Sequence, residues 1–121
     1  MIILGVDYGR RKIGLAISEG KLSQPFKVVK VKSFSHAVEK IIAIQKELKV
    51  ERTIVGVSEG EMGEESTKFA GEIGAVTSTE SLSTHDAQEL SIAAGMSRKK
   101  RKVMEDAFAA SVMLQNYLDE L

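Results

Sequence analysis

The spacing of three short apolar segments within the first 31 residues constrains the fold most strongly. Residues 2–6 and 13–17 are nearly continuous apolar runs, and residues 26–31 alternate apolar with basic side chains. Gly9 and Gly20 mark the short turns between them. Runs this short and this closely spaced are typical of strands, and we expect them to form a three-stranded meander.

An amphipathic helix is expected next. Ser33 or Ser35 is a suitable N-cap, and the segment that follows, up to Lys49, has one broad apolar face. That face comprises Ala37, Val38, Ile41, Ile42, Ile44 and Leu48. The nearly continuous apolar run at residues 53–57 is typical of a strand that is buried on both faces.

The second half of the chain continues this alternation of helices and strands. The polar residues 58–65, which include Gly60 and Gly63, are expected to form a loop. A helix over about residues 64–73 and a short strand at residues 75–79 follow.

Two helices are expected to complete the chain. One begins at Ser83 or Thr84 and ends before Gly95, and the other spans about residues 104–118. The predicted order is β-β-β-α-β-α-β-α-α. We therefore expect one α/β domain over residues 1–121, with a mixed central sheet of about five strands flanked by helices.

Residue composition limits the chemistry. The chain has no cysteine, which excludes disulfides, thiolate zinc sites and cysteine nucleophiles. The two histidines, His36 and His85, leave little scope for imidazole chemistry. A bound metal would therefore be held by oxygen ligands, which favours magnesium or manganese.

The hydropathy of the chain predicts a soluble, cytoplasmic protein without membrane contact. No apolar run approaches the length of about 20 residues that is needed to cross a bilayer. The first residues also lack the basic stretch that precedes the apolar core of a signal peptide.

Charge is unevenly distributed although the net charge is zero. Residues 1–50 sum to +6, residues 51–97 to −7 and residues 98–121 to +1, with an unbroken basic run at residues 98–102. A solvated loop and a phosphate-binding surface are both open interpretations of that run.

Three carboxylates occupy positions where they can converge. Asp7 ends the first strand, Glu80 follows the strand at residues 75–79, and Asp106 lies in the first turn of the last helix. Each position has a purely structural explanation, as a turn cap or as an acid favoured by a helix dipole. Two strand ends and a helix start can meet at one sheet edge, however, and the repulsion between such carboxylates is usually relieved by a divalent cation.

Four segments in the same order resemble motifs of the YqgF (RuvX) family of RNase H-like nucleases. They are DYGRRKIGLAIS at residues 7–18, IVGVSEGEMG at 54–63, ESLST at 80–84 and DAFAASVML at 106–114. The resemblance spans nearly the whole chain and implies an RNase H-like fold. The chain departs from the family pattern at Ser81, where arginine is usual, at Thr79, where aspartate is common, and at residues 58–61.

The resemblance also implies roles for individual residues. It identifies Asp7, Glu80 and Asp106 as catalytic ligands of Mg²⁺ or Mn²⁺, with two ions expected in the site. Ser83 and Thr84 would cap the helix and orient Glu80.

Basic residues near the expected site are candidates for substrate binding. The resemblance places Arg11 near the phosphates of the substrate, with Arg10 and Lys12 beside it. The basic run directly precedes the helix with Asp106, and we expect it to be a flexible loop that is ordered only by substrate. Its candidate phosphate-binding residues are Lys99, Lys100 and Arg101.

The function implied is a metal-dependent endonuclease that hydrolyses phosphodiester bonds in structured nucleic acid. The family is associated with maturation of the 5′ end of 16S ribosomal RNA precursors and with cleavage of Holliday junctions. We favour the ribosomal RNA role, although the residues themselves do not distinguish RNA from DNA. A monomer and a homodimer are both compatible with the sequence.

Two other functions are compatible with parts of the pattern. An ATP-binding module of the actin-type superfamily also has an aspartate-x-glycine turn between two strands, but that fold needs two such domains, and ATP-dependent thermal stabilisation would reveal it. A non-catalytic nucleic-acid-binding domain of the same fold is the second alternative. Retention of three mutually repelling carboxylates argues against it.

Overall fold

The computed structural model describes residues 1–57, 60–79 and 97–120. No helix in these ranges is long and apolar enough to cross a membrane. The elements are β1 (Ile2–Asp7), β2 (Lys12–Ser18), β3 (Ser23–Lys30), α1 (Phe34–Leu48), β4 (Val50–Val57), α2 (Glu61–Ile73), β5 (Val76–Thr79), α4 (Arg98–Val103) and α5 (Glu105–Asp119). The helix expected from Ser83 or Thr84 to Ala94 lies outside the described residues.

The five strands form one mixed sheet in the order β3-β2-β1-β4-β5. Strands β1, β2 and β3 pair antiparallel, as a meander with short turns requires. Strand β4 pairs parallel to β1, and β5 pairs parallel to β4. The parallel pairs follow from helices α1 and α2, which return the chain to the same end of the sheet. The predicted mixed sheet is confirmed.

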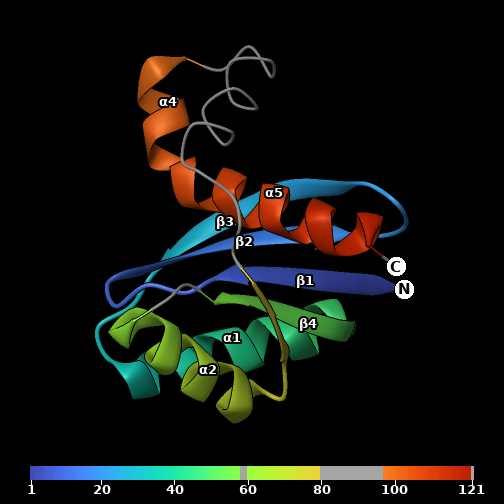
Figure 1. The fold of residues 1–121 in the computed structure, drawn as a ribbon. Coiled ribbons are helices and arrows are strands. Elements are labelled where there is room, and N and C mark those ends of the chain that lie inside the picture. Colours follow the sequence, from blue (N-terminus) through green and yellow to red (C-terminus); the bar gives the residue numbers. More distant parts are fainter. Residues whose placement is uncertain (58–59, 80–96, 121) are drawn as a thin grey trace.

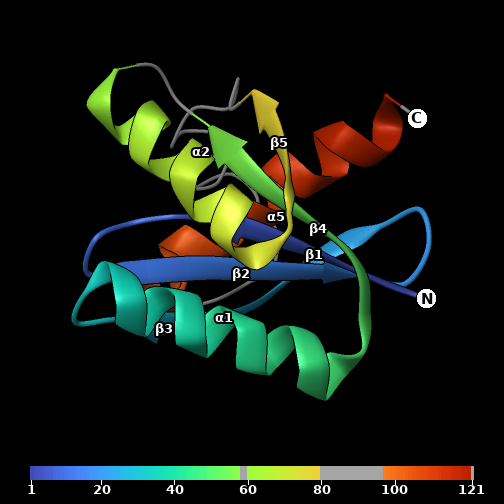
Figure 2. The same cartoon turned by 90° about the horizontal axis from the view of Figure 1, so that it is seen from below.

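Helices cover both faces of the sheet. Figures 1 and 2 show α1 and α2 on one face and α5 on the other. Successive residues of β1 face opposite sides of the sheet. Leu4 and Val6 belong to the core under α1 and α2, whereas Gly5 lies against Leu114 of α5. Asp7 lies two positions after Gly5 in the same strand, so its side chain is on the face of the sheet that α5 covers.

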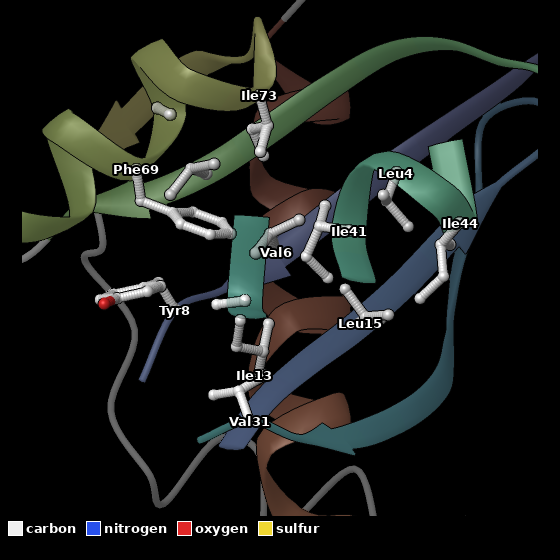
Figure 3. Close-up of a cluster of buried hydrophobic side chains, with 13 residues drawn as sticks. Leu4, Val6, Tyr8, Ile13, Leu15, Val31, Ile41, Ile44, Phe69 and Ile73 are labelled. Carbon is white, nitrogen blue, oxygen red and sulfur yellow. The ribbon is translucent and has the colours of Figure 1, made fainter. Parts of the chain in front are cut away.

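The larger core lies under α1 and α2, and Figure 3 shows its side chains converging from the strands and both helices. Phe69 is fully buried there, and its ring lies 4.6 Å from that of Tyr8 and 5.9 Å from that of Phe34, measured between centroids. Tyr8 lies at the edge of this cluster, with its hydroxyl oxygen directed away from it (Figure 3). A smaller core under α5 contains Ala16, Ile54, Ala110, Met113 and Leu114.

The boundaries of α1 agree with the predicted capping pattern. Ser33 is the N-cap, and its hydroxyl oxygen accepts a hydrogen bond of 3.1 Å from the backbone N–H of His36. Lys49 ends the helix in the left-handed conformation, with its N–H bonded to the carbonyls of Gln45 and Lys46.

Two predicted loops were wrong. Residues 61–65 begin α2 instead of belonging to a loop, because Glu61 and Glu64 suit the positive end of a helix and the helix tolerates the buried Gly63. The basic run at residues 98–102 is helical, as part of α4, instead of a flexible loop. Lysine and arginine are good helix formers, and that local preference decides the conformation here.

The third strand also begins earlier than predicted. It starts at Ser23 and includes Pro25, which lies opposite Ala16 at a register shift between β2 and β3. Because β3 is an edge strand, a residue that lacks an N–H donor is tolerated there.

Candidate active site

Asp7 and Asp106 line one pocket of about 400 Å³ at the end of β1 and the start of α5. Tyr8, Gly9, Arg10, Arg11, Lys12 and Met62 complete its lining. Asp7 is the last residue of β1, and Asp106 lies in the first turn of α5. The structure thus brings together two of the three predicted carboxylates.

Gly14 makes this convergence possible. It is the cross-strand partner of Asp7 in β2, on the face that α5 covers. A Cβ atom at Gly14 would lie 2.0 Å from the carbonyl oxygen of Asp106 and 2.8 Å from the backbone nitrogen of Ala107. No side chain fits in that space, so glycine lets the start of α5 rest directly on the strand beside Asp7.

A cation already lies beside the Asp106 carboxylate. The Lys12 ammonium nitrogen is 3.2 Å from Oδ2 of Asp106, and the two side chains are 57% and 30% exposed. Oδ2 itself is buried and, apart from this ion pair with Lys12, has no hydrogen-bond partner among the described residues. A buried carboxylate oxygen whose only partner is a half-exposed ammonium group is chemically suited to bind a hard cation, and Asp7 adds a second carboxylate to the same pocket.

The complete predicted ligand set cannot be assembled from the described part of the chain. Glu80, the third predicted ligand, and the capping residues Ser83 and Thr84 lie outside it. Within residues 1–57, 60–79 and 97–120, no three acidic or histidine side chains group together as a metal site. Strand β5 does end at Thr79, one residue before Glu80, and it runs parallel to β4 and hence to β1.

Three of the basic residues proposed from the sequence lie in the lining of the same pocket as the two carboxylates. Arg10, Arg11 and Lys12 all line the pocket, and Arg11 and Lys12 are exposed. Lys99 is exposed on α4, which leads directly into α5. Lys100 and Arg101 belong to the same short helix.

Sequence reasoning missed two side chains beside the pocket, Glu65 and Tyr8. Glu65 of α2 lies 3.1 Å from Nε of Arg10, and Tyr8 is 8% exposed. Burial, together with a hydrogen bond to Glu65, raises the pKa of Tyr8 to about 12. The same hydrogen bond, assisted by Arg10, lowers the pKa of Glu65. Their partnership spans two distant segments, and only the burial of the aromatic ring could have suggested it.

The chain as a whole is similar to known proteins. The family model described as "RuvX: Holliday junction resolvase" matches residues 1–120. A protein named "Putative pre-16S rRNA nuclease" from Lactococcus lactis subsp. lactis is 33% identical over 97% of this chain and 93% of its own length. One of the same name from Halothermothrix orenii is 36% identical over 98% and 95%, respectively.

Solved structures with low sequence identity have the same fold. RuvC of T. thermophilus in complex with a Holliday junction substrate has a TM-score of 0.61 at 14% identity, covering 99% of this chain and 96% of its own. The Fowlpox virus resolvase in complex with Holliday junction DNA has a TM-score of 0.64 at 13% identity, covering 99% and 98%. The predicted RNase H-like architecture is confirmed by these neighbours.

Proposed function

The chain belongs to the RuvX family, and on that basis we propose that it is a divalent-metal-dependent endonuclease that hydrolyses phosphodiester bonds in structured nucleic acid. We propose precursor 16S ribosomal RNA as its substrate, with processing of the 5′ end of that precursor as its role, and the cytoplasm as its location. The convergence of Asp7 and Asp106 on one pocket edged by basic side chains is the observation that supports this most directly. The name shared by the two bacterial relatives supports the choice of RNA.

The proposed metal ligands are Asp7, Asp106 and Glu80. The first two line the pocket, and β5 ends at Thr79, directly before Glu80, in a strand parallel to the one that ends at Asp7. Ser83 and Thr84 are proposed to orient Glu80. Bound divalent ions, two in our proposal, would activate a water molecule and neutralise the charge that develops on the phosphodiester oxygens.

The side chains of the pocket itself have separable roles in this proposal. Asp7 and Asp106 supply a concentrated negative charge at one wall of the pocket, and Lys12 balances part of it through its ion pair with Asp106. Arg10 and Arg11 project from the turn between β1 and β2, where they can bind phosphates on either side of the scissile bond.

The test is a cleavage assay of the purified protein on precursor 16S RNA with Mg²⁺ or Mn²⁺, repeated after chelation. We expect cleavage that chelation abolishes and that Asp7→Asn also abolishes. The variant should fold normally or be slightly more stable, because it relieves repulsion with the Asp106 carboxylate. Glu39→Gln, an exposed site on α1, is the matched control and should cut at the normal rate. Full activity of Asp7→Asn would refute the ligand role.

Holliday junction cleavage is a second candidate, because the description of the family model names it. The same assay with a four-way DNA junction in place of RNA decides between the two substrates. Faster metal-dependent cutting of the junction than of the RNA would reverse our preference. Binding without cleavage of either substrate would instead favour a non-catalytic nucleic-acid-binding domain.

A further inference from the structure

We infer that Glu65 is a positioning residue that holds Arg10 at the pocket, so that the terminal guanidinium nitrogens can bind a substrate phosphate. The inference rests on the proposed action on nucleic acid, and it adds a residue from α2 to the binding machinery. Neither the charge of Glu65 nor its place in the sequence suggests such a role, since an acid beside a phosphate-binding surface ordinarily weakens binding.

The interaction between the two side chains is specific. Nε of Arg10 lies 3.1 Å from Oε1 and 3.2 Å from Oε2 of Glu65, across 55 positions of sequence. Arg10 lies in the turn between β1 and β2 and lines the pocket, whereas Glu65 lies in α2. The ion pair therefore fixes the turn that follows Asp7 against a helix that is distant in the sequence.

Tyr8 supports Glu65 from the interior. Its ring packs against those of Phe69, at 4.6 Å, and Phe34, at 6.3 Å, and these contacts hold the ring in place. The hydrogen-bonding interaction of the Tyr8 hydroxyl with Glu65 contributes to the raised pKa of Tyr8 and to the lowered pKa of Glu65. Tyr8 and Arg10 thus both favour the ionised form of Glu65.

The donor geometry of arginine explains what this arrangement provides. A guanidinium group has five N–H donors, and Glu65 occupies the one on Nε. The terminal nitrogens of Arg10 make no hydrogen bond with any described residue, because Glu65 is bonded to Nε alone. They remain available for a bidentate interaction with phosphate, and the orientation of the group is fixed before substrate arrives.

Stability alone does not account for the pair. The Arg10 side chain is 62% exposed, and exposed ion pairs contribute little to the stability of a fold. A pre-oriented guanidinium, by contrast, avoids part of the entropy loss that accompanies immobilisation of a long side chain on binding.

The inference can be tested by binding measurements with chelator present, so that no cleavage interferes. The probes are a labelled hairpin RNA and a labelled four-way DNA junction, followed by fluorescence anisotropy over a range of salt concentrations. We expect Arg10→Ala and Glu65→Ala each to weaken binding by about 3- to 10-fold and to lower the salt slope by up to about 0.9. The double variant should bind no worse than Arg10→Ala, because Glu65 acts through Arg10.

Two further variants separate positioning from charge and from folding. Glu72→Ala removes an exposed acid from the same helix and should bind as tightly as the unmodified protein, or slightly more tightly. Glu65→Gln retains an acceptor for Arg10 and should lie between Glu65→Ala and the unmodified protein. Melting temperatures of all variants show whether the fold is retained, and Glu65→Gln decides the question if Glu65→Ala is unfolded.

Unchanged or tighter binding by folded Glu65→Ala would overturn the inference and would make Glu65 a competitor of the phosphate. An additive double variant would overturn it as well. Failure of the proposed nuclease function is distinguishable, because a protein that binds both probes but cuts neither would leave the binding results for Arg10 and Glu65 intact.

Discussion

Gly14 determines, at the scale of a single residue, how closely Asp106 can approach Asp7. We predict that Gly14→Ala destabilises the fold by about 1 to 3 kcal/mol, because the new methyl group overlaps the backbone of Asp106. The cleavage rate of the folded fraction should also fall about 100-fold, since a shift of about 1 Å in a catalytic group has that effect. Chemical denaturation and a cleavage assay measure the two effects.

The matched control for that substitution is Gly71→Ala. A Cβ atom at Gly71, on the exposed side of α2, would meet no atom within 4 Å. Alanine should therefore stabilise the helix by up to about 1 kcal/mol and leave cleavage unchanged. If Gly14→Ala behaved in the same way, the close packing of α5 on β2 would not position Asp106.

The phenol of Tyr8 provides a second prediction at this scale. Its pKa is raised from 10.0 to about 12 in the folded protein, so the folded state holds the proton more tightly than the unfolded chain. This contribution to stability is complete below about pH 10 and disappears as the pH rises to about 12. Tyr8→Phe should remove that part of the pH dependence of unfolding.

Absorbance of the tyrosinate ion measures the titration directly. Tyr8 and Tyr117 are the two tyrosines of the chain, so Tyr117→Phe leaves a single signal. That variant also removes the hydroxyl that accepts a bond from Arg52, so its stability must be measured first. A transition near pH 10 would contradict the burial of Tyr8 and its hydrogen bond with Glu65.

At the scale of elements, α4, with the sequence RKKRKV, directly precedes the helix that contains Asp106. We predict that changing Lys99, Lys100 and Arg101 together to Ala lowers the slope of log affinity against log salt. The decrease should be about 0.7 to 0.9 for each phosphate that these side chains neutralise in the unmodified protein. Alanine is a strong helix former, so α4 should persist and the weaker binding should reflect charge.

Lys21→Ala combined with Lys46→Ala is the control for α4. Lys21 precedes β3 and Lys46 lies in the last turn of α1, and both are exposed at the end of the sheet opposite the pocket. We expect this pair to change the slope by less than the amount for one phosphate. An unchanged slope in the α4 variant would make that helix a solvated connector and would leave binding to Arg10, Arg11 and Lys12.

The elements differ in how well the sequence predicts them. Strands β1, β2 and β4 and helices α1 and α5 have long apolar patterns or clear caps, and their predicted boundaries lie within about three residues of those observed. The start of α2 and the helix α4 were missed because glycine, and then a run of like charges, suggested loops. In both places local helix preference prevails, and no periodic apolar signal reveals it.

The candidate site likewise contains residues that the sequence predicts and residues that it does not. Asp7, Asp106, Arg10, Arg11 and Lys12 were predicted because strand ends and helix starts collect at sheet edges, and because the motifs resemble those of a family. The interactions of Glu65 were not predicted, because they depend on how α2 packs against the turn after β1. That packing brings together Arg10 and Glu65, which are 55 positions apart in the sequence. Such a pairing has no periodic signature in one sequence.

For the whole molecule, the question is whether one copy acts alone. The exposed large apolar side chains of the described residues are Met1, Leu22, Val76 and Val103, which come from four separate parts of the chain. Single exposed apolar residues are ordinary on monomers, whereas a stable dimer buries a broad apolar surface. The described residues therefore favour a monomer, and light scattering tests this prediction, with an expected mass of 13.2 kDa.

A monomer has one pocket of the kind formed by Asp7 and Asp106, and resolution of a junction needs two symmetrical cuts. On a supercoiled plasmid with an extruded cruciform, we predict that nicked circles accumulate first and linear product appears later, because the two cuts are independent. Asp7→Asn should give neither product. A single cut is enough to mature one end of an RNA, so independent nicking of the plasmid would favour the ribosomal RNA substrate. Direct conversion to linear plasmid, together with the mass of a dimer, would show paired active sites and favour the junction.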